Sequence, residues 1–262
     1  MPTRAIWKAQ IRIGRIVVPV KLFSAVEDRN IHFRLLHRDD LTPVEQHMVN
    51  PQNGESVPGE EIRRGYETAE GDIVLLDAEE LQALQVEGAP FIEVYGFIDP
   101  SLIHHQWVDR PYYLGPDGDS GPYSALVSAL EAEKKVALAQ WKMRQKRYFG
   151  VIRSFGAYLT IITLRYAQEV IEVSSIPRTE SRALEKPELK MAEQLVKALE
   201  GDFDPQAFKD EYRNRLMALL ERKGRGEKVV LHKPKEQKAV VVSLADLLKR
   251  SLTQVEKERR VA

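Results

Sequence analysis

Alternating apolar and polar positions dominate the first half of the chain. Apart from Ile6, apolar side chains recur at every second position over residues 5–13, with basic or polar side chains between them, and this period of two predicts a strand. Gly14 and Arg15 predict a turn into a second strand over 16–23, where Pro19 favours a sheet edge or a bulge. Similar runs predict strands over 31–36 and 91–98 and a short helix over 77–84.

The clearest alternation covers residues 136–147. It predicts one strand with Trp141 and Met143 on one face and a basic row of Lys142, Arg144 and Lys146 on the other. A turn over 154–156 and a β-rich run over 158–166 follow. A polar row is most often a solvated strand face. Like charges on one face repel, however, and a phosphate backbone would relieve that repulsion.

The last third of the chain changes to helical spacing. Apolar positions over 189–199 predict one helix, and residues 201–203 break it. Asp204 is expected to cap a second helix, with Pro205 at its first position and Gly224 just beyond its end. Both helices are expected to pack against a core.

A linker and a last helix are predicted after residue 225. Residues 226–238 are polar and contain Pro234, which is typical of a tether. Ser243 and Asp246 form a capping-box pattern at the start of an amphipathic helix over 243–260. Such a helix is marginal alone, so its apolar stripe needs either a partner protein or its own domain. The stripe consists of Leu244, Leu247, Leu248, Leu252 and Val255.

The distribution of charge matters more than its total. The chain has 39 basic and 39 acidic residues, and this balance alone argues against nucleic-acid binding. Residues 1–26 and 134–168 contain no acid, however, whereas residues 55–99 are acidic with only Arg63 and Arg64 as bases. A polyanion responds to the local field, so a basic face on a neutral protein suffices. Charge blocks of this kind also arise by chance on solvated surfaces.

Residues typical of catalysis or metal binding are sparse. The chain has no cysteine, so it can form neither a disulfide nor a thiolate metal site. It has no Gly-rich phosphate loop after a strand and no Gly-x-Ser-x-Gly motif, and its histidines lie at spacings that favour structural roles. We therefore expect no enzyme activity, no metal and no cofactor. The absence of a long apolar run and of a signal peptide predicts a cytoplasmic protein with no membrane partner.

Several short segments occur in an order that is specific to one family. They are Arg4-Ala5-Ile6-Trp7-Lys8, Val18-Pro19-Val20-Lys21-Leu22-Phe23, Phe33-Arg34-Leu35-Leu36-His37, Val57-Pro58-Gly59-Glu60, Pro111-Tyr112-Tyr113-Leu114-Gly115-Pro116, Thr163-Leu164-Arg165-Tyr166 and Asp202-Phe203-Asp204-Pro205. Together they resemble the bacterial Ku family, the DNA-end-binding proteins of non-homologous end joining. The resemblance runs from about residue 4 to residue 225.

The resemblance implies an α+β, mainly β fold with a Ku-type β-barrel core, a helical C-terminal part and a homodimer that forms a ring around a DNA end. The implied boundaries are 1–225 for the core, 226–238 for a linker and 239–262 for a partner-binding helix. The implied partner is the ATP-dependent multifunctional DNA ligase of bacterial end joining, and the implied location is the bacterial nucleoid. Some family members carry a CxxC pair where residues 50–53 read Asn-Pro-Gln-Asn here, which rules out a zinc site at that position.

The predicted function is sequence-independent binding of double-stranded DNA ends and recruitment of a DNA ligase in double-strand break repair. A metal-dependent nuclease and a protein-only scaffold without DNA affinity stay as alternatives. Basic side chains would contact phosphates, and the stripe of the last helix would contact the ligase or its own core. The DNA-binding candidates are Arg12, Lys21, Arg63, Arg64, Lys142, Arg144, Lys146 and Arg165.

Overall fold

The computed structural model describes residues 4–84, 90–178 and 185–227, together with residues 248, 249, 251 and 253. The chain divides into two compact units, Met1–Ser175 and Ile176–Ala262. Most of the predicted linker and of the last helix lies outside the described residues. Of the predicted apolar stripe only Leu248 is described, and it is half-buried in a helical segment.

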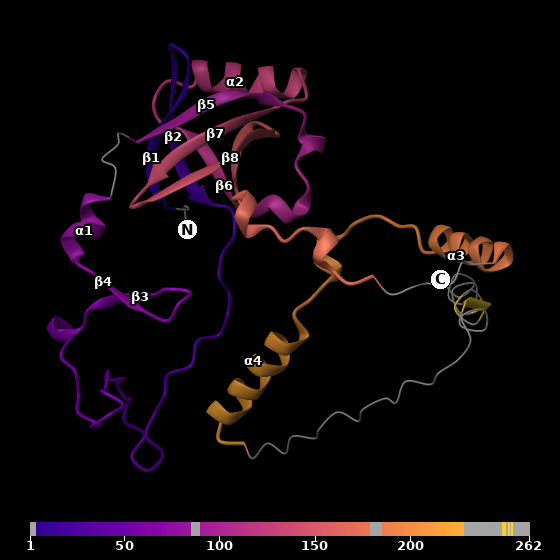
Figure 1. Ribbon diagram of the computed structural model, residues 1–262. Helices are drawn as coiled ribbons and strands as arrows, with labels where there is room; N and C mark the ends of the chain where they lie inside the picture. Colours follow the sequence, from indigo (N-terminus) through magenta and orange to yellow (C-terminus); the bar gives the residue numbers. More distant parts are fainter. Residues whose placement is uncertain are drawn as a thin grey trace. The chain divides into compact units, whose positions relative to one another are not determined.

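Seven strands of the first unit close into a barrel (Figure 1). Their order is β1-β2-β6-β9-β8-β7-β5, and neighbours are antiparallel except β1 and β5, whose parallel pairing closes the barrel. The mainly β fold with a barrel core that the family resemblance implied is confirmed. The strands are β1 (Trp7–Ile13), β2 (Ile16–Ser24), β5 (Phe91–Ile98), β6 (Val108–Pro116), β7 (Val136–Met143), β8 (Lys146–Phe155) and β9 (Tyr158–Leu164).

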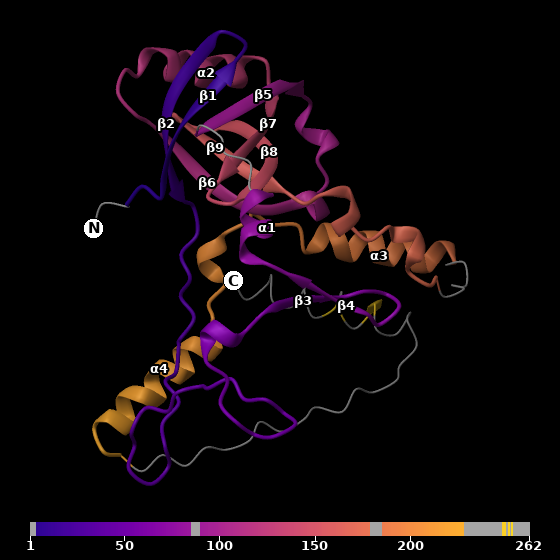
Figure 2. The ribbon, with the colours of Figure 1, turned by 60° about the vertical axis from the view of Figure 1, so that its left-hand side comes forward.

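Side chains at every second strand position fill the barrel interior, because successive residues of a strand point to opposite faces. On β2, for example, Val18, Val20 and Leu22 are all buried. Helix α2 (Gly121–Ala132) packs against β2 and β8 and lies across the barrel in both views (Figures 1 and 2). It adds four buried side chains to the same core, Tyr123, Leu126, Val127 and Leu130.

Tyr123 of α2 joins two strands through its hydroxyl group. The side chain is 3% exposed. Its hydroxyl donates to the carbonyl oxygen of Leu114 on β6 at 2.5 Å and accepts from the N–H of Leu159 on β9 at 2.8 Å. These two residues form the last pair of the β6–β9 ladder. Burial raises the pKa of the Tyr123 hydroxyl above its ordinary value, so the group stays neutral and can make both hydrogen bonds.

Pro19 lies on β2, which pairs with β1 on one side and with β6 on the other, so the sheet edge predicted from it is wrong. Its partner on β1 is Gln10, whose N–H points away from β2 and donates to the carbonyl oxygen of Pro90 at 2.9 Å. The Gln10–Pro19 pair therefore needs no N–H from the proline. The missing N–H faces β6 instead, where the ladder begins only at Val20 and Pro116.

The segment between β2 and β5 forms little regular structure. Strands β3 (Arg64–Glu67) and β4 (Ile73–Leu76) make a two-stranded sheet, and α1 (Ala78–Ala83) confirms the predicted short helix. The strand predicted over 31–36 is wrong, since only an isolated bridge between Leu36 and Pro43 forms there. Phe33 and Leu35 are both exposed, so the alternation there has no core to face.

Short 3₁₀ turns of the first unit lie at Gly59–Glu61, Pro100–Leu102, His105–Trp107, Ala167–Glu169 and Val173–Ser175.

The second unit contains α3 (Lys186–Ala198) and α4 (Glu211–Gly224). Both predicted helices exist, but α4 begins later than expected. Asp204 caps only a 3₁₀ turn, Pro205–Ala207, and it is the Asp210 side chain that accepts from a backbone N–H of α4. Gly224 is the last helical residue, and the left-handed glycine beyond the end is Gly226, with φ of 77°.

Many apolar side chains of the second unit are exposed, contrary to the expected packing against a core, although Leu195, Leu216 and Leu219 are half-buried. Phe203, Phe208 and Tyr212 are 84%, 78% and 70% exposed, and α4 has no buried residue. Within the described part of the chain, no helix is long and apolar enough to cross a membrane.

Candidate nucleic-acid interface

The basic row predicted on one strand is wrong, because the chain turns back within it. β7 ends at Met143, Arg144 and Gln145 form the turn, and β8 begins at Lys146. Met143 pairs with Lys146 and Lys142 pairs with Arg147, so the four basic residues surround one hairpin tip.

The two faces of this hairpin both carry positive charge. Cross-strand partners share a face, and the Trp141–Tyr148 pair belongs to the barrel interior. Lys146 is two positions from Tyr148 and therefore lies on the interior side at the barrel mouth, 5.5 Å from the Tyr148 ring. Lys142 and its partner Arg147 lie on the outer side.

Arg144 occupies the tip in a left-handed conformation. Its φ is 58°, a region that residues with a Cβ rarely adopt. The side chain is exposed. Neither Arg144 nor Gln145 is a residue that favours this kind of turn, where glycine or asparagine is usual.

Buried groups fix the base of the hairpin. Trp141 and Tyr148 stack with ring centroids 5.8 Å apart. Gly150 on β8 faces the Trp141 ring and the β9 backbone so closely that a Cβ there would lie 2.1 Å from the carbonyl oxygen of Ile162. The indole N–H of Trp141 is buried without a hydrogen-bond partner in the described structure. This packing fixes the two strands of the hairpin against the barrel core beneath the exposed tip.

Three of the predicted DNA-binding residues are neutralised within the protein. Arg12 pairs with a carboxylate oxygen of Glu93 at 3.0 Å and stacks over the Phe91 ring at 3.6 Å. Lys21 pairs with Asp117 at 2.7 Å, and this contact and that of Lys8 hold the pKa of Asp117 below its usual value.

Arg165 is the third, and it joins the end of β9 to the start of β6. Its guanidinium donates to the carbonyl oxygen of Val108 and lies 3.7 Å from Asp109. By contrast, none of the four basic residues of the hairpin forms an ion pair with any residue that the structure describes. These four, Lys142, Arg144, Lys146 and Arg147, are called the tip cluster below.

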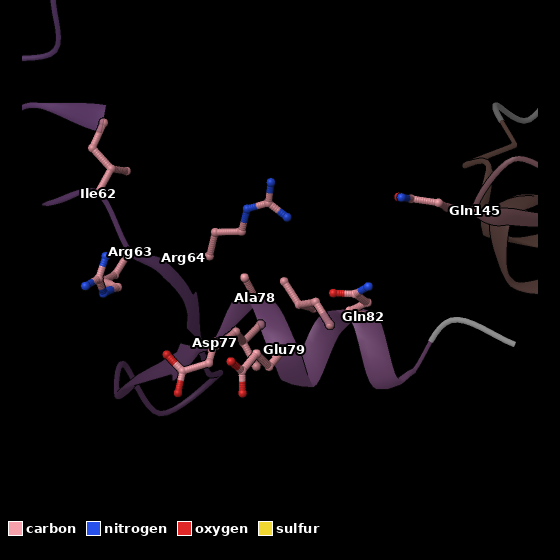
Figure 3. Close-up of a pocket in the computed structure, with 10 residues that line it drawn as sticks. Ile62, Arg63, Arg64, Asp77, Ala78, Glu79, Gln82 and Gln145 are labelled. Carbon is pink, nitrogen blue, oxygen red and sulfur yellow. The ribbon is translucent and has the colours of Figure 1, made fainter. Parts of the chain in front are cut away.

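Arg63 and Arg64 lie at the start of β3, beside a recess of about 830 Å³ (Figure 3). Arg63 donates to the carbonyl oxygen of Glu60 at 2.7 Å. Figure 3 shows the Arg64 guanidinium extended away from α1 into the recess, whose lining also includes Gln145 of the β7–β8 turn.

Arg147 was missed by the reading of the sequence. Once the turn is placed at residues 144–145, its pairing with Lys142 follows from the register, but the sequence contains no turn signal there. Among the residues that the structure describes, three of the eight predicted residues form ion pairs and five do not. The five without an ion pair to a described residue are Arg63, Arg64, Lys142, Arg144 and Lys146.

The described residues offer no metal centre. No group of three or more His, Asp or Glu side chains there is placed to hold an ion. His37 instead contacts Asp40 at 2.7 Å, and hydrogen bonds from Thr42 and then His37 hold the pKa of Asp40 below its usual value. At residues 50–53, hydrogen bonds within the loop close the turn, including one from the Gln52 N–H to Asn50 at 3.0 Å.

Known proteins of one family match this chain over most of its length. The family described as "Ku70/Ku80 beta-barrel domain" matches residues 12–191. "Non-homologous end joining protein Ku 2" of Geotalea uraniireducens is 39% identical over 230 residues, which cover 88% of this chain and 90% of the relative. "Non-homologous end joining protein Ku" of Pseudomonas aeruginosa is 34% identical over 259 residues, covering 95% and 88%. The protein of the same name from Coxiella burnetii is 33% identical, covering 100% and 98%.

Proposed function

Because the chain belongs to the Ku family, we propose that it binds the ends of double-stranded DNA in non-homologous end joining, without enzyme activity and without reading sequence. The relatives are named for non-homologous end joining. The binding energy would come from basic side chains that neutralise phosphates and release counterions, which is independent of sequence. End selectivity would come from a closed ring that needs a free end to load.

The tip cluster is the observation that carries this proposal. A side chain already paired with a carboxylate gains less from a phosphate, because the internal ion pair must be given up. Lys142, Arg144, Lys146 and Arg147 have no such pair among the described residues, and they lie within six consecutive positions. We assign the DNA contact to this cluster together with Arg64, and a smaller share to Arg12, Lys21, Arg63 and Arg165.

The second unit supports a homodimer. Exposed aromatic side chains such as Phe203 and Phe208 need a partner surface, and a second copy of the chain with two-fold symmetry would supply one. Light scattering should report twice the chain mass of 30.0 kDa. A monomer that binds DNA ends tightly would contradict the ring.

Recruitment of an ATP-dependent DNA ligase is assigned to the last helix, beyond a core of residues 1–225 and a linker of residues 226–238. The support is the amphipathic pattern of the helix and the polar segment before it. Truncation after Gly226 should leave end binding and dimerisation nearly intact and abolish stimulation of the ligase. A truncated chain that unfolds or loses its dimer would show that the helix belongs to the core.

A pair of triple variants tests the interface. Replacing Lys142, Arg144 and Lys146 by alanine should make the negative slope of log K against log salt shallower by roughly three units, about one unit for each lost phosphate contact. The matched control replaces Arg15, Lys134 and Arg153 by alanine, which removes the same charge from the opposite end of the barrel. Equal slopes for the two variants would place the DNA elsewhere on the protein.

A further inference from the structure

The tip of the β7–β8 hairpin combines backbone strain with exposure. Arg144 has φ of 58°, and a left-handed conformation costs stability for every residue that carries a Cβ. Glycine would adopt it without that cost. The side chain of Arg144 is exposed and makes no hydrogen bond or ion pair with a described residue, so packing does not account for an arginine there. Backbone strain of this kind is often retained at functional sites, and at Arg144 it coincides with three neighbouring basic residues.

The charges flanking Arg144 point to both sides of the hairpin. Lys142 and Arg147 lie on the outer face, and Lys146 lies on the inner face at the barrel mouth. A ribbon that lies flat along a phosphate backbone would carry its basic residues on one face. Basic residues on both faces suit a ribbon that approaches the duplex tip first, with a strand of phosphates on each side.

We propose that Arg144 enters the minor groove of the duplex, while Lys142 and Arg147 contact the phosphates of one strand and Lys146 those of the other. This inference rests on the proposed binding of double-stranded DNA. The minor groove is about 6 Å wide, which is too narrow for a two-stranded ribbon but admits one extended arginine. It presents the same acceptors for A·T and T·A and adds only the guanine amino group for G·C, so an arginine there reads no base sequence beyond this difference and the width of the groove.

The proposed contact predicts a dependence on groove width. Narrow minor grooves, as in A-tracts, have an enhanced negative potential that favours arginine, whose guanidinium is less strongly hydrated than an ammonium group. Affinity for a linear duplex with a central A-tract should therefore exceed that for a G·C-rich duplex of the same length. Arg144→Lys keeps the charge, so it should keep the salt slope and reduce the preference for the A-tract.

Lys134 supplies a matched control for Arg144. It also has a positive φ, 50°, and is also exposed, but it lies just before β7 whereas Arg144 lies just after it. The two positions are about 25 Å apart along the strand. Arg144→Gly and Lys134→Gly each remove one charge and one strained Cβ, so both should raise the urea midpoint. Only Arg144→Gly should weaken DNA binding, by about tenfold, and lower the salt slope by about one.

The decisive measurement is fluorescence anisotropy with linear duplexes in the presence and absence of netropsin, which occupies the minor groove of A-tracts. Netropsin should weaken binding of the wild-type protein to the A-tract duplex and leave the Arg144→Gly variant nearly unaffected. Wild-type binding that ignores netropsin, or that both glycine variants weaken equally, would overturn the groove contact while leaving DNA binding in place. A wild-type protein that binds no linear duplex at all would overturn both proposals.

Discussion

Removing the hydroxyl group of Tyr123, on helix α2, should destabilise the barrel. The hydroxyl satisfies a buried carbonyl oxygen on β6 and a buried N–H on β9, at 2.5 Å and 2.8 Å. In Tyr123→Phe both backbone groups lose this partner, and the ring leaves them no access to water, since the side chain is only 3% exposed. Each unsatisfied buried group costs about 1–3 kcal/mol.

Partial relaxation of the β6–β9 ladder would recover some of that cost, so we expect a net loss of about 2–4 kcal/mol. With a urea m-value of about 2 kcal/mol/M, the unfolding midpoint should fall by roughly 1–2 M. Tryptophan fluorescence is a suitable probe, because Trp141 is buried in the same core.

Tyr95→Phe is the matched control. Its hydroxyl donates to a side-chain oxygen of Gln140 at 3.3 Å, but the residue is 69% exposed. Water replaces that hydrogen bond, so the free energy of unfolding should stay within about 0.5 kcal/mol of that of the wild-type protein. A Tyr123→Phe variant as stable as this control would refute the reasoning. It would mean that the Leu159 N–H and the Leu114 carbonyl oxygen form a direct hydrogen bond at no cost.

Two further predictions concern stability. Gly150→Ala should cost more than about 3 kcal/mol, because its Cβ would lie 2.1 Å from the carbonyl oxygen of Ile162, whereas Gly59→Ala, with open space around it, should change the thermal midpoint little. Hydrogen bonds from Ser101 lower the pKa of Asp99 to about 2. A lowered pKa means that the stabilising effect of Asp99 is complete above its ordinary pKa near 3.8 and disappears as the pH falls through about 2. An NMR titration that gives Asp99 an ordinary pKa would contradict this, and Ser101→Ala should raise the value.

The sequence predicts β1, β2, β5 and β9, because each has one buried face and one solvated face, but it does not predict β6 and it merges the end of β7 with the start of β8. The failures have physical causes. The alternation continues across Arg144 and Gln145 without glycine, asparagine or proline, so nothing marks the turn. Because of the two-residue turn, Lys146 faces the same side as Met143. Lys142 and Lys146, which an uninterrupted strand would place on one face, therefore lie on opposite faces. Only the observed register reveals that the basic residues surround a tip.

Pairing of charges could not be predicted from local patterns either. Arg12 and Glu93 are neighbours because β1 and β5 close the barrel in parallel, a contact between distant segments. Lys21 likewise meets Asp117 only through the β2–β6 pairing. Composition gives each of these cations the same weight as Lys142. The fold separates them, because it brings a carboxylate to some and leaves others facing solvent.

Competition between linear and closed circular duplexes of identical sequence tests the central claim most directly. A ring that loads from a free end should bind the linear form and be displaced from a labelled linear duplex far more effectively by linear competitor than by closed circles. The phosphate contacts available are the same in both forms, so the difference isolates the requirement for an end. Equal competition by the two forms would contradict end binding.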